Sequence, residues 1–181
     1  MTTLYVDNIA PNLQSKISAP NLTLPSGSVI QCVTDNKTVG NGPHNADIKD
    51  LAISATGGFG TAVQIQSLNI TPKFSNSKIL VQWTGQMRMN MSGVSGGIQM
   101  FFGKDGSNLL SSGGNHDSAI FMYSTQQLTD HYQAQAAQFA FTAGQTTQMT
   151  LDVRMNCYNS TATIFLSHDG LECLTAWEIA Q

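Results

Sequence analysis

The residue types that most often carry out chemistry are present in this chain, but their spacing does not assemble a site. The histidines lie far apart in the sequence, and none forms the short-spaced pair that holds a metal ion. Serine, histidine and aspartate all occur, yet no Gly-x-Ser-x-Gly elbow marks a nucleophile. We therefore interpret the histidines as ordinary loop or strand-end residues. They are His44, His116, His131 and His168.

The carboxylates and the glycine-rich segments are equally poor candidates for catalysis. Glu172 and Glu178 fall on one face of the last expected strand, whereas a paired-carboxylate hydrolase needs its two acids across a cleft. The glycine-rich segments 57–60 and 93–97 lack the strand-to-helix context and the Lys-Ser/Thr ending of a phosphate-binding loop. We expect these segments to be loops at one end of the fold. The sequence predicts no enzyme activity, no cofactor and no metal site.

The three cysteines favour structural roles. An odd number of cysteines cannot complete a disulfide framework, and no Cys-x-x-Cys or Cys/His spacing indicates zinc. Cys157 and Cys173 each belong to a row of apolar residues at strand spacing, where a free cysteine acts as a small buried hydrophobe. The alternative is a bridge between these two or a reactive thiol. The third cysteine, Cys32, lies in the first expected strand.

The composition is that of an extracellular or particle-bound β protein. Only 10% of the residues are charged, against roughly 25% in an ordinary soluble domain. Ser, Thr, Asn and Gln make up 63 of the 181 residues. The net charge of -3 is scattered without a basic stripe, which argues against nucleic acid as a partner. No apolar stretch is long enough to insert into a membrane, and the first 14 residues lack the features of a signal peptide.

Alternation of polar and apolar residues predicts the elements that would position any site. The alternation is clearest in 78–91, where a glycine and three methionines face one way, opposite Gln, Arg and Asn. About nine or ten strands and few helix candidates predict an all-β sandwich or barrel, and eight core strands would make a jelly roll. The other expected strands are one around 29–33, a short one within 48–54, and 63–70, 98–103, 108–111, 119–125, 132–142, 148–158, 161–167 and 171–180.

Two apolar rows raise the question of which face is buried. The row Met87, Met89 and Met91 either fills the core or packs against a sister subunit, and the sequence leaves both alternatives open. In the last strand, we expect Trp177 and Ile179 to face the core. Glu178 then belongs to the opposite face.

The N-terminal segment differs from the rest of the chain. Residues 1–27 contain three prolines in a Ser- and Asn-rich context, which predicts an extended arm before a domain over 28–181. The arm either packs onto its own domain or docks onto another subunit. Its apolar side chains, too few for a core, include Leu4, Tyr5, Val6, Ile9 and Ile17.

Three strings of residues resemble a family of tailed-bacteriophage virion structural proteins. They are LYVDNIAPNLQSKI at 4–17, ITPKFSNSKILVQW at 70–83 and LTAWEIAQ at 174–181. The resemblance implies a proline-bearing arm that precedes a jelly-roll β-sandwich of the tumour-necrosis-factor type. It further implies that the last strand ends in a WEIA-like string. It also implies a trimeric fibre, knob or decoration protein located in the virion. The polar stretch 35–61 is longer than this family leads us to expect.

Two hypotheses about function follow from the residues and the resemblance together. The first is a non-enzymatic virion component, in which the apolar residues of the arm dock onto other capsid or tail proteins and the copies form a homotrimer. The alternative is a receptor-binding or glycan-binding adhesin at the tip of a tail fibre, with aromatic side chains that stack on sugars of the host surface. The candidates for such stacking are Tyr123, Tyr132 and Tyr158.

Overall fold

The structure, a computed structural model, describes the greater part of the predicted domain. The described residues are 24–38, 51–54, 56–91, 95–110, 117–129, 131–159, 162–166 and 171–181. These ranges contain eleven strands and one short 3-10 helix. They are β1 (Val29–Thr38), β2 (Leu51–Ile53), η1 (Phe59–Thr61), β3 (Val63–Ile70), β4 (Lys78–Met91), β5 (Gly96–Lys104), β6 (Ser107–Asn108), β7 (Ile120–Ser124), β8 (His131–Thr142), β9 (Met149–Cys157), β10 (Ala162–Leu166) and β11 (Leu171–Ile179).

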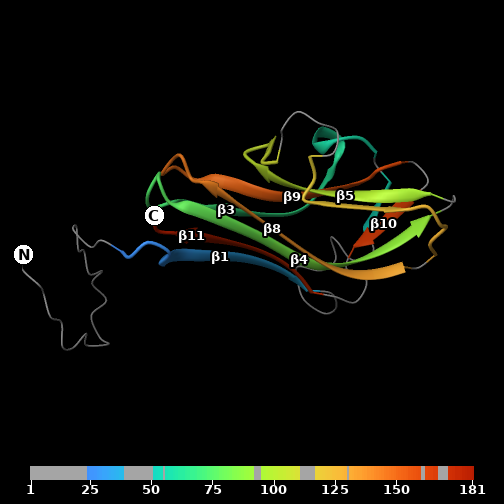
Figure 1. The fold of residues 1–181 in the computed structure, drawn as a ribbon, viewed down its shortest axis with the longest axis horizontal. Coiled ribbons are helices and arrows are strands. Elements are labelled where there is room, and N and C mark those ends of the chain that lie inside the picture. The colour runs from blue at the N-terminus through green and yellow to red at the C-terminus, as the bar shows by residue number, and fades with distance from the viewer. Residues whose placement is uncertain are drawn as a thin grey trace, which may run out of the picture.

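The strands form two antiparallel sheets that face each other (Figure 1). In the first, which we call the β4 sheet, the order is β1-β11-β4-β8, with β10 continuing along β4 beyond β11 and pairing with β2. In the second, the β9 sheet, the order is β3-β9-β5-β7, with β6 beside the end of β5. Eight strands in this interleaved order make a jelly roll, which confirms the predicted fold class.

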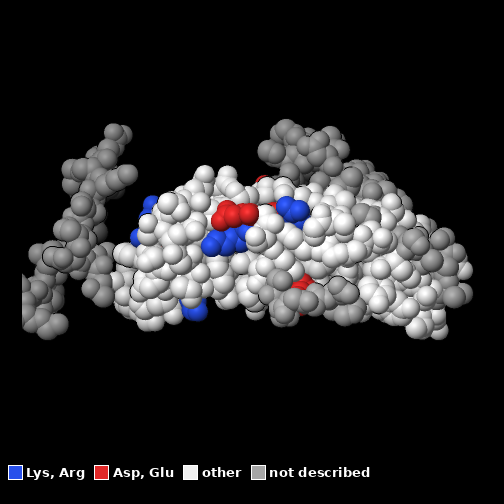
Figure 2. All heavy atoms as spheres, turned by 90° about the horizontal axis from the view of Figure 1, so that it is seen from above, with Lys and Arg blue, Asp and Glu red and all other residues white. Residues whose placement is uncertain are grey.

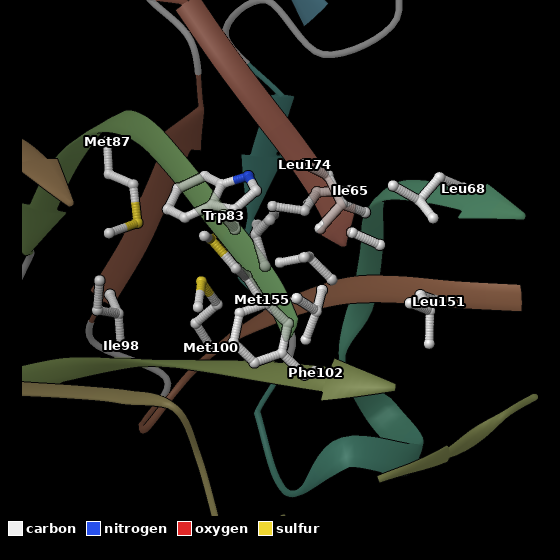
Figure 3. Packing of buried hydrophobic residues seen from close by; sticks show 14 of the residues in the cluster. Ile65, Leu68, Trp83, Met87, Ile98, Met100, Phe102, Leu151, Met155 and Leu174 are labelled. Carbon is white, nitrogen blue, oxygen red and sulfur yellow. The ribbon is translucent and has the colours of Figure 1, made fainter. Parts of the chain in front are cut away.

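The core lies between the two sheets and is made by the apolar side chains that point inward from both of them. Figure 3 shows Trp83 of β4 among Met100, Phe102, Met155 and Leu174, all at most 1% exposed. The indole N–H of Trp83 donates a hydrogen bond to the Gln66 side chain at 3.0 Å, so its polar atom is paired inside the core.

The methionine row of β4 is part of this core. Met87, Met89 and Met91 are only 2–3% exposed and pack within the same cluster of buried residues. The sequence left two alternatives open for this row, and in the structure the three methionines fill the core. The expectation of a subunit interface at these residues needs a correction, because their side chains point between the sheets and have no outer surface to offer.

The expected orientation of the last strand was wrong. Pairing with β4 places Ala176 beside Val81 and Glu178 beside Ile79, so that the even-numbered row of β11 points inward. Glu178 is fully buried, whereas Trp177 and Ile179 are half-buried on the outer face. The outward row with Trp177 and Ile179 is the more apolar of the two, so local hydrophobicity does not account for the buried row, in which Glu178 is held by hydrogen bonds.

Those hydrogen bonds join the C-terminal strand to the turn before β4. The carboxylate of Glu178 accepts bonds from the backbone N–H of Lys73 at 2.8 Å and of Phe74 at 3.0 Å. It also accepts bonds from the hydroxyl of Ser77 and the side-chain amide of Gln31, both at 2.6 Å. We call this arrangement the Glu178 node. It shows how a charged residue is accommodated in the interior.

The cysteines are free, and only one of them is a core residue. Cys157 is buried, as expected, and its thiol donates a hydrogen bond to the carbonyl of Ile53 at 3.1 Å. Cys173 lies half-buried on the outer face of β11, which corrects the expectation of a buried apolar row. Cys32 is exposed. The alternative of a bridge between Cys157 and Cys173 is therefore not realised.

Candidate functional site

Three exposed aromatic rings meet on the outer face of the β9 sheet. Phe121 and Tyr123 come from β7, and Tyr158 follows the last residue of β9. The exposed fractions of these residues are 44%, 48% and 41%, unusually high for side chains of this size. We call these three residues the aromatic cluster.

Strand geometry brings the three rings together. Phe121 and Tyr123 are two residues apart and therefore share one face of β7. Their rings are nearly parallel, with centroids 6.5 Å apart. The ring of Tyr158 stands edge-on to both, at 5.2 Å from Phe121 and 5.7 Å from Tyr123. Contacts of this kind are favourable beyond the area that they bury, so the rings hold one another in place.

A glycine of β5 leaves the space in which the cluster forms. Gly97 lies opposite Tyr123 in the ladder and accepts a hydrogen bond from the backbone N–H of Tyr158 at 2.7 Å. A Cβ at this position would lie 2.5 Å from the carbonyl oxygen of Met122 and 3.1 Å from the ring of Tyr123. The cluster therefore depends on a residue without a side chain between its two tyrosines.

Two buried amide side chains continue the same face beside the rings. Gln99 pairs with Phe121 on one side and with Asn156 on the other, and the two amide residues are 2% and 0% exposed. The Asn156 amide donates to the carbonyls of Gly57 and Gly58. Its Oδ1 is buried and has no hydrogen-bond partner in the described part of the chain.

The glycine-rich segment 57–60 therefore lies over a sheet, and the expectation of a loop at the end of the sandwich was wrong. Phe59 packs edge-on against Phe101 of β5, with centroids 6.0 Å apart. Arg154 of β9 lies over the ring of Phe59 at 4.6 Å and forms an ion pair with Asp152 at 2.7 Å. These contacts fix the segment on the outer face of the β9 sheet, beside Asn156.

The described residues of the face that carries the cluster are mostly uncharged. Figure 2 views the molecule from above the β9 sheet, and few of the described residues on this face are acidic or basic. Arg154, on the same face of β9 as Tyr158, is occupied by Asp152 and Phe59. The surface can therefore offer ring faces and hydroxyls, and little net charge.

The structure brings together two of the three tyrosines proposed from the sequence. Tyr132 lies on β8 beside Arg88 of β4, on the outer face of the other sheet, and so it cannot act with Tyr123 and Tyr158. Sequence reasoning missed Phe121. The available signal was its spacing of two residues from Tyr123 in a strand.

Among the described residues, the other side chains considered for chemistry do not form a second site. Within the described ranges there is no group of three or more His, Cys, Asp or Glu side chains that could hold a metal ion. His131 is exposed at the start of β8, and the other three histidines lie outside the described residues. The same is true of the proposed docking residues Leu4, Tyr5, Val6, Ile9 and Ile17. No helix of the described chain is long and apolar enough to cross a membrane.

Comparisons with known proteins find only distant similarity. No protein-family model matches the chain, and no curated protein matches it significantly. Among solved structures, the sugar-binding C-terminal domain of EclA is 12% identical with a TM-score of 0.33, over 93% of this chain and 99% of that chain. The CBM22-1 xylan-binding domain of Xyn10C from Paenibacillus barcinonensis is 10% identical with a TM-score of 0.35, over 88% and 99%. A chain of the Israeli acute paralysis virus particle is 10% identical with a TM-score of 0.28, over 99% and 84%.

Similarity this weak carries no argument about ligand, partner or location. The fold rests instead on the strand order of the structure itself. By that order the chain contains a jelly-roll β-sandwich domain with an aromatic cluster on one outer face.

Proposed function

We propose that this chain is a non-enzymatic structural component of a bacteriophage virion, anchored by its N-terminal arm. The observation that supports this most strongly is the Glu178 node. Two of the three strings that resemble virion proteins meet there, because Glu178 belongs to LTAWEIAQ and the residues that it binds in the turn belong to ITPKFSNSKILVQW. The resemblance therefore involves residues that cooperate in one packing arrangement, and not isolated matches.

Electron microscopy of purified phage particles with the chain labelled by a specific antibody tests this function. We expect label at a regular position on the capsid or tail, with a fixed copy number per particle. Particles that lack the chain would overturn the proposal.

We further propose that the copies form a homotrimer through edge strand β8. Within the described residues, β8 pairs with β4 alone, over twelve residues without a bulge. It contains no Lys, Arg, Asp, Glu or Pro, the residues that commonly keep an edge strand from pairing. Its inward residues Phe139 and Phe141 remain only partly buried. In a trimer, the neighbouring copy would cover this edge with a different part of its surface, because pairing of one β8 with another would make a two-fold dimer.

The aromatic cluster favours a second candidate function, a receptor-binding or glycan-binding tip. Large aromatic side chains that gather on an outer face commonly mark a binding surface. Competition between the purified chain and intact phage for adsorption to host cells tests this function. We expect the chain to reduce adsorption in proportion to its concentration, and unchanged adsorption at saturating chain would refute a role in attachment.

A further inference from the structure

We propose that the aromatic cluster binds a neutral carbohydrate. This inference rests on the second candidate function and adds to it the residues and the chemistry of the ligand. Phe121, Tyr123 and Tyr158 form the contact surface.

The exposed faces of the rings suit the apolar side of a sugar. A pyranose ring presents C–H groups on its faces and hydroxyls around its rim, so it can lie against an aromatic face while the hydroxyls reach polar neighbours. The cluster combines three rings with two phenolic hydroxyls, which both donate and accept hydrogen bonds. This combination of apolar area and a few polar groups is typical of small-molecule sites.

The site is ordered before a ligand arrives. The rings are in mutual contact at 5.2–6.5 Å and are carried by strands on both sides of Gly97. Asn159, next to Tyr158, donates a hydrogen bond to the backbone carbonyl of Ser95 at 3.1 Å, which ties the end of β9 to the start of β5. Binding to side chains that are already held in place loses less conformational entropy than binding to mobile ones.

The polar surroundings favour a neutral ligand over an anionic one. Among the described residues on this face of β9, the basic one is Arg154, and its guanidinium forms an ion pair with Asp152. An acidic sugar or a phosphate would therefore find little to neutralise it. Uncharged polar groups are at hand, because the exposed Tyr123 and Tyr158 carry phenolic hydroxyls that both donate and accept hydrogen bonds.

Glycan-array binding of the full-length chain tests the inference. The array carries neutral oligosaccharides of hexoses and N-acetylhexosamines beside their sialylated and sulfated counterparts, and the best neutral hit is then titrated by calorimetry. We expect Tyr123→Ala and Tyr158→Ala each to weaken binding by roughly tenfold or more, as for a central contact residue. Tyr132→Ala is the matched control, because it removes an equally exposed tyrosine from the other sheet, and it should leave the affinity unchanged.

Phenylalanine variants separate loss of binding from loss of folding. Tyr123→Phe and Tyr158→Phe keep the rings, and they should retain most of the affinity with unchanged melting. The inference is overturned if no neutral glycan binds, if only acidic glycans bind, or if Tyr132→Ala weakens binding as much as the cluster variants. It is also overturned if the cluster variants abolish self-association and glycans do not bind, since the cluster would then be a contact between copies.

The outcome is independent of the virion proposal. A chain that labels purified particles and binds no neutral glycan refutes only the carbohydrate site. A chain that binds glycan through the cluster and is missing from particles refutes only the virion function.

Discussion

Replacing Glu178 by glutamine should destabilise the fold and change its response to acid. The carboxylate accepts hydrogen bonds from four donors in two other segments of the chain, β1 and the turn before β4. Glutamine has the same shape, but one of its oxygens becomes an NH₂ group that faces donors, and the remaining bonds lose the assistance of the charge. Hydrogen bonds to a charged group contribute roughly 1.5–3 kcal/mol each, so we expect a loss of about 3 kcal/mol at pH 7.

The pKa of Glu178 gives this prediction its pH dependence. Burial alone would raise the pKa, but the bonds from Ser77, Lys73, Phe74 and Gln31 outweigh burial and lower it below the usual value of 4.5. A lowered carboxyl pKa contributes stability above the pKa of the unfolded chain, and this contribution is lost as the pH falls through the lower value of the folded state. The difference between the native chain and the Glu178→Gln variant should therefore shrink below about pH 4.5.

Urea unfolding followed by tryptophan fluorescence measures both effects at a series of pH values. Asp105→Asn is the matched control, because Asp105 is exposed and its carboxylate accepts one backbone N–H bond, from Thr150 at 2.9 Å. This variant should change the free energy of unfolding by less than about 0.5 kcal/mol at pH 7. Equal stabilities for the native chain and Glu178→Gln at pH 7, or a difference that stays constant down to pH 3, would refute the role assigned to the node.

Three further predictions concern the cluster, the arm and the assembly. Gly97→Ala should lower the free energy of unfolding by about 1–3 kcal/mol and alter the near-ultraviolet circular dichroism of the tyrosines, because its Cβ would meet a backbone carbonyl at 2.5 Å. The control is Gly58→Ala, whose Cβ would meet nothing within 4 Å, and equal behaviour of the two variants would contradict the packing described. Deletion of residues 2–24 should leave the melting temperature unchanged and remove the chain from purified particles, and incorporation at normal copy number would show that the arm is not the anchor. Sedimentation of the native chain should show a trimer, and the Ala136→Lys variant, changed on the exposed row of β8, should sediment as a monomer. A monomeric native chain, or a variant that remains trimeric, would refute assembly through this edge.

The sequence by itself determined the strands and the class of fold. Alternation of side chains is a local property, because successive residues of a strand point to opposite faces whatever lies beyond them. The pattern of 78–91 therefore predicted a strand with an apolar odd-numbered row, and the structure has this row of β4 in the core. The short strand expected within 48–54 is β2. Enough strands of this kind, with few helix candidates, left a sandwich or barrel as the expected architecture.

Only the tertiary structure decided which face of β11 is buried. Both rows of this strand contain apolar residues, so the local pattern favoured the row with Trp177 and Ile179. The buried row is the one whose Glu178 finds hydrogen-bond donors in the turn 73–77, about one hundred residues earlier in the chain. A local pattern of side chains cannot indicate hydrogen-bond partners that are so distant in the sequence.

The candidate site depends on the tertiary structure for the same reason. The spacing of Phe121 and Tyr123 is visible in the sequence, but Tyr158 joins them only because β7 and β9 pair with opposite edges of β5 at Gly97. Tyr132 is just as exposed and is excluded only because β8 belongs to the other sheet. Sheet membership and register are set by contacts between distant segments, and they decide which exposed rings share a face.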